Sequence, residues 1–369
     1  MLEYLFIAFI VIFCIQFIYY LFIFSSFSFS KKSPTENHFN LPVSIIICAK
    51  NEAKNLTKNL PHFLKQNYPN FELVLINDRS NDRTLKVMEQ FRKESLIPVK
   101  VVDVASNEQF WGSKKYALTL GIKAASFEHL LFTDADCIPI SESWIHEMAS
   151  NFTNQHQIVL GYGAYQKIKK SWLNKLIRFE SLFTAMQYFG YAKIGIPYMG
   201  VGRNLAYTKS TFFKVNGFAN HMHIKSGDDD LFINEVATKQ NTAISCSQNS
   251  FTESNPKTSF KDWILQKRRH ISTASLYKPL HKFLLGLFFA SQMLFWILAI
   301  ILLGFLYNWQ LIAILVFTRF LFLYLVIGFS AKKLNERDLI LLIPFFEIFL
   351  ILTQMFIFIK NMISKPTHW

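Results

Sequence analysis

Cysteine is scarce in this chain, and the two common glycine-rich phosphate-binding loops are missing. The four cysteines among 369 residues are scattered and match neither a metal-ligand spacing nor a disulfide pattern, which indicates reduced thiols in a cytoplasmic setting. The sequence contains no Gly-x-x-x-x-Gly-Lys-Ser/Thr loop and no Gly-x-Gly-x-x-Gly fingerprint. A P-loop enzyme and a dinucleotide-binding enzyme are therefore excluded, and a bound diphosphate would need a metal ion or basic side chains.

Charged residues are also few, at 17% of the chain, whereas hydrophobic residues reach 51% and include 39 Phe. This composition is too apolar for ordinary soluble domains. Four stretches account for the excess, at residues 5–24, 283–307, 309–328 and 339–359. The first three are long enough to span a bilayer, and the fourth either crosses it or lies partly in the interface. The first has no small-residue cleavage site and no preceding basic region, so we expect an anchor and not a cleaved signal.

Arg319 is the only charged residue inside the stretch 309–328. An arginine at the centre of a membrane segment costs about 2.5–3.5 kcal/mol on insertion scales, so a buried partner is expected. Glu347, in the fourth apolar stretch, is the candidate partner.

Acidic residues are outnumbered, 25 against 39 basic ones, which gives a formal net charge of +14. Nucleic-acid binding is one explanation of such a balance. Basic clusters flank the apolar stretches, at 31–32, 267–269 and 332–337, so we favour the positive-inside bias of a membrane protein. The region from about 31 to 282 is then predicted to face the cytoplasm and anionic membrane lipid, with no nucleic-acid partner.

Strands alternate with helices in the first part of that region. The β-branched run at 43–49 predicts a buried strand, and further strands are expected at 71–78, 99–104 and 130–133. Helices are expected to follow at 50–64, from about 84 to 93, and at 114–125. This alternation predicts an α/β fold with a parallel sheet covered on both faces, and ligands at the carboxyl ends of the strands.

Asp134 and Asp136 end the fourth predicted strand, one residue apart. In a strand they lie on the same face and repel each other unless a cation sits between them. Mg²⁺ or Mn²⁺ prefers such oxygen ligands and leaves room for substrate phosphates. A solvated turn is the alternative for an isolated Asp-x-Asp.

Glu52 and Asp78 also follow predicted strands, so the acidic groups of three strand ends are expected to meet in one crevice. Each alone could instead be a helix cap or turn residue. Lys114 and Lys115, near the start of a helix, add cations that suit a phosphate or a solvated helix face.

The order of these motifs resembles the family 2 glycosyltransferases, which are membrane-bound, inverting enzymes with a GT-A fold. The resemblance covers roughly 42–273 and the flanking apolar stretches. Its motifs are Ala49-Lys50-Asn51-Glu52, Asn77 to Thr84, Gly112-Ser113-Lys114-Lys115-Tyr116-Ala117-Leu118, Asp134-Ala135-Asp136, Gly202-Arg203-Asn204-Leu205-Ala206, Gly227-Asp228-Asp229-Asp230-Leu231 and Gln266-Lys267-Arg268-Arg269-His270.

The resemblance implies a nucleotide-sugar donor, with a UDP-sugar favoured, and a divalent Mg²⁺ or Mn²⁺ held by Asp134 and Asp136. The donor would be contacted by residues from several of the motifs, namely Glu52, Asp78, Lys114, Lys115, Asp134, Gln266 and Arg269. It also implies three regions: a transmembrane anchor at 1–30, a cytoplasmic catalytic domain at 40–275, and a transmembrane region of two or three helices at 280–369.

The family's catalytic base lies in a Glu-Asp pair, whose counterpart here is the run Asp228-Asp229-Asp230. Asp229 is the first candidate and Asp228 the second. The alternative is a charge cluster at the start of a helix.

His270 stands where the family has Trp in Gln-x-x-Arg-Trp, and this departure argues against processive polymerisation. The predicted function is transfer of one sugar to a lipid-linked or other membrane-proximal glycan acceptor in cell-envelope glycan synthesis. A processive polysaccharide synthase and a non-catalytic nucleotide-sugar-binding membrane protein are the alternatives.

Trp172, Leu176, Phe179 and Phe183 recur at helical spacing and form one apolar face. Core packing is the favoured interpretation. An interfacial helix that guides a lipid-borne acceptor is the alternative.

Overall fold

The computed structural model describes residues 1–31, 41–105 and 114–364. By contacts the chain divides into two compact units. The sheet unit consists of Lys32–Lys169 and Gly195–Lys257, and the helical unit of Met1–Lys31, Lys170–Ile194 and Thr258–Trp369. The predicted boundaries of the catalytic domain, 40–275, stay a prediction, because compact units are defined by packing and a catalytic domain by the residues that it needs.

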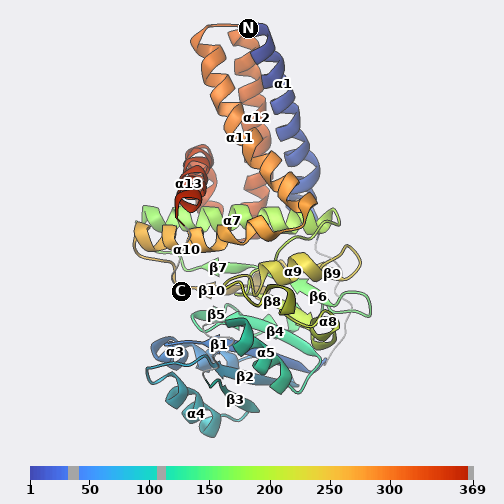
Figure 1. Ribbon diagram of the computed structural model, residues 1–369, viewed down its shortest axis with the longest axis vertical. Helices are drawn as coiled ribbons and strands as arrows, with labels where there is room; N and C mark the ends of the chain where they lie inside the picture. The colour runs from blue at the N-terminus through green and yellow to red at the C-terminus, as the bar shows by residue number, and fades with distance from the viewer. Residues whose placement is uncertain (32–40, 106–113, 365–369) are drawn as a thin grey trace. The chain divides into compact units, whose positions relative to one another are not determined.

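A seven-stranded mixed sheet organises the sheet unit (Figure 1). In spatial order its strands are β3 (Val99–Asp103), β2 (Phe71–Asn77), β1 (Val43–Ala49), β4 (His129–Asp134), β8 (Leu205–Thr208), β6 (Ile158–Leu160) and β9 (Thr242–Ile244). The first four are parallel, and they are the four strands that the sequence predicts. The other three were not expected, and β8 is antiparallel to both of its neighbours.

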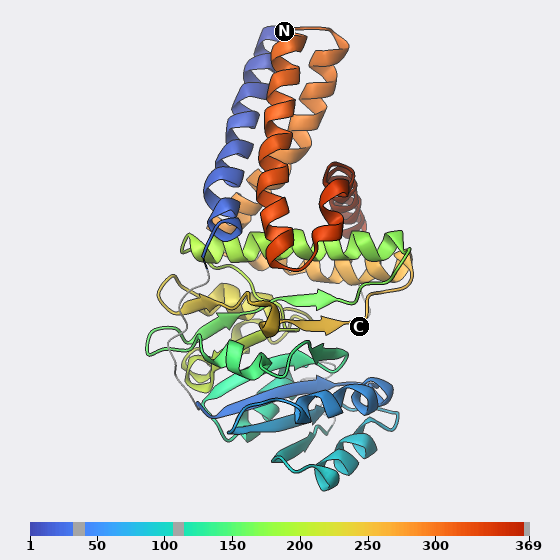
Figure 2. The same ribbon diagram turned by 180° about the vertical axis from the view of Figure 1, so that it is seen from behind.

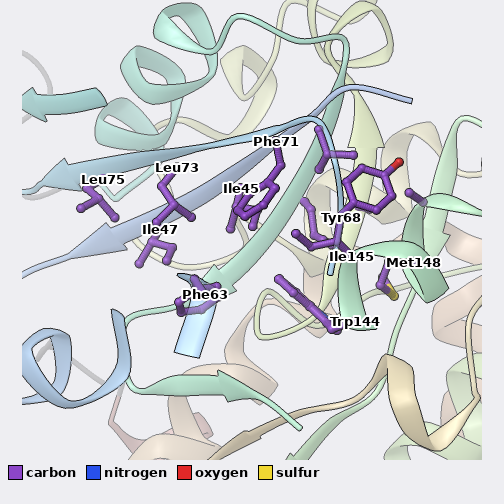
Figure 3. Packing of buried hydrophobic residues seen from close by; sticks show 14 of the residues in the cluster. Ile45, Ile47, Phe63, Tyr68, Phe71, Leu73, Leu75, Trp144, Ile145 and Met148 are labelled. Atoms are coloured by element: carbon purple, nitrogen blue, oxygen red, sulfur yellow. The ribbon is translucent and has the colours of Figure 1, made fainter. Parts of the chain in front are cut away.

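Alternate residues of the parallel strands pack into two layers, as the period of a strand requires. One face of β1 and β2 packs against α3 (Ala53–Leu64), α4 (Thr84–Glu94) and α6 (Trp144–Ala149). Figure 3 shows this core, with Ile45, Ile47 and Leu73 facing Phe63 and Trp144. The sheet is therefore buried against helices on this face.

The opposite face packs against α5 (Lys114–Ala124). Gly121 lets this helix approach closely, because a Cβ there would lie 2.1 Å from the Cδ1 atom of Ile76. Lys114, the first described residue of α5, lies near the carboxyl end of β4, where its Nζ is 3.0 Å from Asp134 Oδ1.

A small second sheet and several short helices complete the sheet unit. The sheet has the order β5 (Cys137–Pro139), β10 (Thr252–Ser254) and β7 (Gly163–Tyr165). The short helices are α8 (Lys209–Lys214), η3 (Ala219–His221), α9 (Asp230–Val236) and η4 (Gln248–Ser250). β5 follows the Asp134-x-Asp136 motif directly, so this sheet anchors the motif from its far side.

The helical unit contains four helices that are long and apolar enough to cross a membrane: Leu2–Ser28, Pro279–Gly304, Trp309–Lys333 and Arg337–Ile363. The first comprises α1 (Leu2–Ile18), the π-helical η1 (Tyr19–Phe24) and α2 (Ser25–Ser28), and the others comprise α11 (Pro279–Gly304), α12 (Trp309–Lys333), η6 (Arg337–Leu342) and α13 (Ile343–Ile363). α1, α11 and α12 lie side by side as a bundle, and α13 stands beside it (Figure 2). All four apolar stretches of the sequence are thereby helical.

Arg319 and Glu347 form a buried ion pair between α12 and α13, as predicted. Arg319 Nη1 donates to Glu347 Oε2 at 3.1 Å, and Nη2 donates to Glu347 Oε1. Gln16 Oε1 accepts from Arg319 Nη2 at 3.2 Å, and Gln292 Nε2 lies 3.4 Å from Glu347 Oε1. This network joins four apolar helices without leaving a lone charge.

The predicted apolar face of residues 172–183 is buried in its second half only: Phe179 and Phe183 are 1% and 3% exposed, whereas Trp172 is 59% exposed. It lies on α7 (Trp172–Lys193), where the rings of Phe179 and Phe183 pack on Phe346 and Phe288, with centroids 5.2 and 6.1 Å apart. α7 runs alongside α10 (Phe260–Ser272), and Lys267 of α10 pairs with Glu180 of α7 (Figure 2). The remaining short helix of the unit is η5 (Ala274–Leu276).

Candidate functional site

The carboxyl ends of β1, β2 and β4 meet at one edge of the sheet. Ala49 is paired with Asn77 across β1 and β2, and Cys48 with Asp134 across β1 and β4. Glu52, Asp78 and Asp134 therefore follow neighbouring strands, as the sequence predicts.

The loops after β1 and β2 are tied together by hydrogen bonds. Asn51 N donates to Ser80 Oγ at 3.0 Å, Asn81 N to Asn51 Oδ1 at 2.8 Å, and Glu52 N to Thr84 Oγ1 at 2.8 Å. Asn51 adopts a positive φ of 58°, which asparagine tolerates better than most residues. These bonds fix the backbone that carries Glu52.

The two acids at these loops have different surroundings. Asp78 is buried, and its carboxylate Oδ1 accepts a hydrogen bond of 2.8 Å from Arg79 Nε. Glu52 is half-buried, and burial raises its pKa, with a further upward contribution from the nearby Asp136 and Asp134 and an opposing one from the hydrogen bond of Asn55. Glu52 is thus the acid that shares an electrostatic field with the Asp-x-Asp motif.

Lys114 bridges two of the predicted acids. Its Nζ lies 3.0 Å from Asp134 Oδ1 and 3.0 Å from Asp228 Oδ2. Burial alone would lower the pKa of Lys114, but the two carboxylates outweigh it and raise that pKa well above its ordinary value. The same ammonium offsets the burial of Asp228, whose pKa is lowered. The acidic run and the Asp-x-Asp motif are therefore joined by one permanent cation.

Asp229 is the N-cap residue of α9, and its side chain contacts Gly202. Its Oδ2 accepts a hydrogen bond from Gly202 N at 2.7 Å, and its Oδ1 accepts one from Asp230 N at 2.8 Å. Burial, then repulsion from Asp228 and Asp230, raises the pKa of Asp229 to about 7. The residue is a helix cap, as the alternative interpretation held, and also a carboxyl group poised to exchange a proton near neutral pH.

These groups line one small, partly open pocket. It is lined by polar residues and by apolar ones. The polar residues are Lys114, Thr133, Asp134, Asp228 and Asp229, and the remaining lining residues are Ile46, Cys48, Leu118, Phe132, Gly202, Leu205 and Tyr207. A pocket lined by apolar side chains together with a few charged ones is typical of ligand sites.

Asp134, Asp136 and Cys137 offer ligand atoms within 4.8 Å of one another. Burial, then the charge of Asp134, raises the pKa of Asp136, so this pair would gain from a cation. Burial also raises the pKa of the Cys137 thiol, which keeps it protonated and leaves the two carboxylates as donors. Carboxylate oxygens fit Mg²⁺ or Mn²⁺.

Lys115 does not line the pocket with Lys114. Its side chain is buried, and its Nζ donates to the backbone carbonyls of His221 at 2.7 Å and Ile224 at 3.1 Å. Burial lowers the pKa of Lys115 to about 8, against the upward effect of the three acids Asp228–Asp230. The donor contact predicted for this residue stays a prediction that its geometry does not favour.

Gln266 and Arg269 lie on α10 of the helical unit. The predicted Gly112 and Ser113 fall outside the described residues. The other predicted site residues, Glu52, Asp78, Lys114, Lys115, Asp134, Asp136, Asp228 and Asp229, all belong to the sheet unit.

Arg203 is a structural feature of the site to which the sequence assigns no role. Its guanidinium lies 4.1 Å from the ring centroid of Tyr165, and Nη1 donates to Ala164 O and Ser254 Oγ at 3.0 and 3.1 Å. Its own carbonyl accepts from Thr133 Oγ1 at 3.0 Å. Arg203 thus connects β7 and β10 to the end of β4, and its charge opposes the raised pKa of Asp136. The sequence could have indicated this role, because Arg203 belongs to the motif Gly202-Arg203-Asn204-Leu205-Ala206.

Four parallel strands in the order β3-β2-β1-β4, followed by an antiparallel β8, with an Asp-x-Asp at the end of β4 and an acidic helix start, define a GT-A fold. A solved structure supports this: a mannosyltransferase of Pyrobaculum calidifontis, determined in complex with GDP-Man and Mn²⁺, superimposes with a TM-score of 0.61 at 16% identity over 91% of this chain and 99% of that one. At this identity the likeness concerns the fold.

Residues 44–215 match the family model described as Glycosyl transferase family 2. The chain therefore carries a family 2 glycosyltransferase region, as its motifs predicted.

Curated relatives share parts of this region. A poly-β-1,6-N-acetyl-D-glucosamine synthase of Staphylococcus epidermidis is 33% identical over 96 residues, which is 26% of this chain and 22% of the relative. A 4,4'-diaponeurosporenoate glycosyltransferase of Staphylococcus haemolyticus is 26% identical over 202 residues, 52% of this chain and 50% of the relative. The matches thus span about a fifth to a half of these relatives' lengths.

Proposed function

We propose that this protein is a membrane-anchored, inverting glycosyltransferase. It would move a sugar from a nucleotide-sugar donor to a lipid-linked or other membrane-proximal glycan acceptor in cell-envelope glycan synthesis. One observation carries the proposal: Asp229, held by Gly202 N–H, lines the same pocket as the Lys114-bridged acids Asp134 and Asp228. A candidate base therefore lies beside a candidate diphosphate site.

Lys114 is the residue best suited to meet the donor diphosphate. It is partly exposed and paired with acids on two elements, so an incoming phosphate would take up its charge with little rearrangement. Glu52 and Asp78 would contact the nucleoside from the loops after β1 and β2, and Gln266 and Arg269 would contribute from α10. A UDP-sugar is the donor that we favour, and a nucleotide sugar also accompanies the Pyrobaculum mannosyltransferase.

Asp134 and Asp136 would hold a divalent Mg²⁺ or Mn²⁺. Such an ion, when bound, supplies positive charge at the diphosphate, where negative charge develops as the donor bond breaks. Lys114 adds a second positive charge at the same edge of the sheet. The carboxylate pair is the reason to expect the ion.

Asp229 would act as the general base. Its carboxylate accepts the proton of the acceptor hydroxyl while the hydroxyl oxygen bonds to the anomeric carbon of the sugar. The bond from that carbon to the diphosphate oxygen breaks on the opposite side, and the nucleoside diphosphate leaves. A single displacement of this kind inverts the anomeric configuration. The raised pKa of Asp229 suits this role at neutral pH.

The four long apolar helices would hold the enzyme at the membrane, which explains a membrane-proximal acceptor. The basic clusters flanking them favour a cytoplasmic catalytic domain, from about 40 to 275. Nucleotide sugars are soluble and membrane-linked acceptors are not, so a membrane-anchored catalytic site would serve both.

A processive polysaccharide synthase is the second candidate, because one curated relative is named as a poly-β-1,6-N-acetyl-D-glucosamine synthase. His270 in place of the family's Trp argues against it. A protein that only binds nucleotide sugars is the third possibility. Product length separates the first two candidates, since transfer of one sugar gives a single defined product and a synthase gives a ladder.

The test is release of nucleoside diphosphate by the purified protein in detergent. UDP- and GDP-sugars are supplied in turn with Mn²⁺ or Mg²⁺ and with extracted membrane lipid as acceptor. We expect metal-dependent release with one donor, lost in Asp134→Asn and lowered about 10²- to 10⁴-fold in Asp229→Asn. Donor binding that is equal in wild type and Asp229→Asn, without release in either, would support the non-catalytic alternative. Failure to bind any donor would contradict all three candidates.

A further inference from the structure

Lys115 is a lysine in an unusual environment. Only 1% of its side chain is exposed, although lysine is among the residues least often buried. Its ammonium donates to two backbone carbonyls, those of His221 and Ile224, at 2.7 and 3.1 Å. Hydrogen bonds from a cation are stronger than neutral ones, and they hold the backbone between these two residues against α5.

The segment that Lys115 holds leads directly to the acidic run. It begins at Gly217, with a φ of +62°, contains η3, and passes through Gly227, with a φ of +89°, before Asp228. On its other side Asn220 Nδ2 donates to Glu235 Oε1 of α9 at 2.5 Å. The segment is short of regular structure, so its position depends on such contacts.

Lys114 and Lys115 are consecutive on α5, and consecutive helical side chains point about 100° apart. The Lys114 ammonium lies 3.0 Å from Asp228 Oδ2, which follows Gly227. The Lys115 ammonium instead bonds to the carbonyls of His221 and Ile224, which precede Gly227. α5 therefore holds this segment at two places, one on each side of Gly227.

We infer that Lys115 is a positioning residue, which fixes the segment 217–229 so that Asp229 is presented to the acceptor hydroxyl. This rests on the proposed function and differs from the donor contact that the sequence predicts for Lys115. The neighbouring acids make the buried charge tolerable, because all three carboxylates of Asp228–Asp230 favour the charged form of Lys115. The lysine thus acts on the reaction through Asp229 and not through the diphosphate.

The experiment compares three lysines of one helix. Lys115→Met keeps the apolar stem and removes the ammonium, Lys114→Met removes the cation of the pocket, and Lys123→Met alters an exposed lysine as the matched control. For Lys115→Met we expect kcat to fall about 10- to 100-fold, because a small misplacement of a catalytic group has effects of this size, with the donor KM within about twofold of wild type. Lys114→Met should raise the donor KM, and Lys123→Met should change neither constant.

Hydrogen exchange of the amides in 222–229 supplies a readout that does not depend on turnover. These amides should exchange faster in Lys115→Met than in wild type, with those of β1 unchanged. If Lys115→Met does not fold, Lys115→Gln carries both measurements with the same expectation.

Three results separate the possible failures. A raised donor KM with unchanged kcat would make Lys115 a donor ligand and overturn the inference. Unchanged exchange in 222–229 would overturn it as well, whatever the kinetics. A wild-type protein that releases no diphosphate from any donor would instead overturn the proposed function, and with it the catalytic role given to the segment.

Discussion

Two ion pairs, one in each unit, differ in how far they are open to solvent: Arg319 with Glu347 in the helical unit and Lys114 with Asp134 in the sheet unit. In the helical unit the clearest case is the closed pair of Arg319 and Glu347, which are 2% and 1% exposed. Arg178 is also 2% exposed, and it pairs both with the buried Glu336 and with Asp338, which is 45% exposed. In the sheet unit Lys114 is 24% exposed and Asp134 is 34% exposed, although they are also paired. A closed pair has no room for another partner, whereas a partly open one can exchange its partner for a ligand.

This difference separates a structural charge from a functional one. Arg319 and Arg178 each join helices, and removing one partner would leave an uncompensated buried charge. Lys114 instead stands between two acids of different elements at the edge of a pocket. Pairing alone would not have distinguished these sites, and exposure does.

The largest expected effect is that of Asp229→Asn. Asparagine has a single acceptor oxygen, so it can keep the hydrogen bond from Gly202 N–H or the cap to Asp230 N–H but not both, and it cannot take a proton. We expect kcat to fall about 10²- to 10⁴-fold, with the thermal unfolding transition still cooperative. Steady-state release of nucleoside diphosphate measures the first quantity and thermal unfolding the second. A variant with more than a third of wild-type kcat would exclude Asp229 as the base and leave Asp228 as the candidate.

Glu347→Gln should have the next largest effect, on stability. The change leaves the Arg319 guanidinium buried among apolar helices without a counter-ion, which costs about 3 kcal/mol. Thermal unfolding in detergent should show a clearly lowered midpoint. The paired change of Arg319→Met with Glu347→Leu is the matched control, and it should recover most of the loss. A Glu347→Gln protein as stable as wild type would show that the closed pair is not structural.

The pH dependence of turnover sharpens the role of Asp229. Only its carboxylate form can accept a proton, and its pKa is raised to about 7. Below that pH, kcat/KM should therefore fall about tenfold per unit, and above it the rate should level off. The groups around Asp229 are Asp228 just before α9, Asp230 on α9, Lys114 and Lys115 on α5, and Tyr207 on β8. A profile flat from pH 5 to 8 would contradict this assignment.

The smallest effect is expected for Arg92→Ala, which removes a surface pair with Glu89 on α4. The two side chains are 46% and 35% exposed, so solvent screens their attraction. The free energy of unfolding should change by no more than about 0.5 kcal/mol, and kcat should not change. Denaturant unfolding measures this free energy. A loss of stability above about 1 kcal/mol would show that the exposed fraction of a charged pair does not predict its contribution to stability.

The parallel half of the fold could be predicted because its strands are strongly patterned. The run 43–49 is β-branched and buried on both faces, and the helices between the strands fix a parallel order. β8, β6 and β9 could not be predicted in the same way. They contain only three or four residues each, and their pairing depends on contacts distant in sequence.

The positions of site residues could be predicted where the sheet alone brings them together. They could not be predicted where a side chain's contacts depend on how its helix packs against other segments. Glu52, Asp78 and Asp134 follow neighbouring strands, so the sheet alone places them at one edge. Lys114 and Lys115 are identical in type and adjacent, and only the packing of α5 against the segment 217–229 sends one to the pocket and the other to backbone carbonyls. The pairing of Arg319 with Glu347 was predictable because an apolar helix offers an arginine few other partners.

The most direct test of the central claim is the anomeric configuration of the product. Once a donor is identified, the first glycosylated product can be examined by ¹H NMR, in which the coupling of the anomeric proton reports its configuration for gluco-configured sugars. Displacement by a hydroxyl activated by Asp229 predicts a linkage of configuration opposite to that of the donor. A retained configuration would contradict the single displacement and the role of Asp229 together.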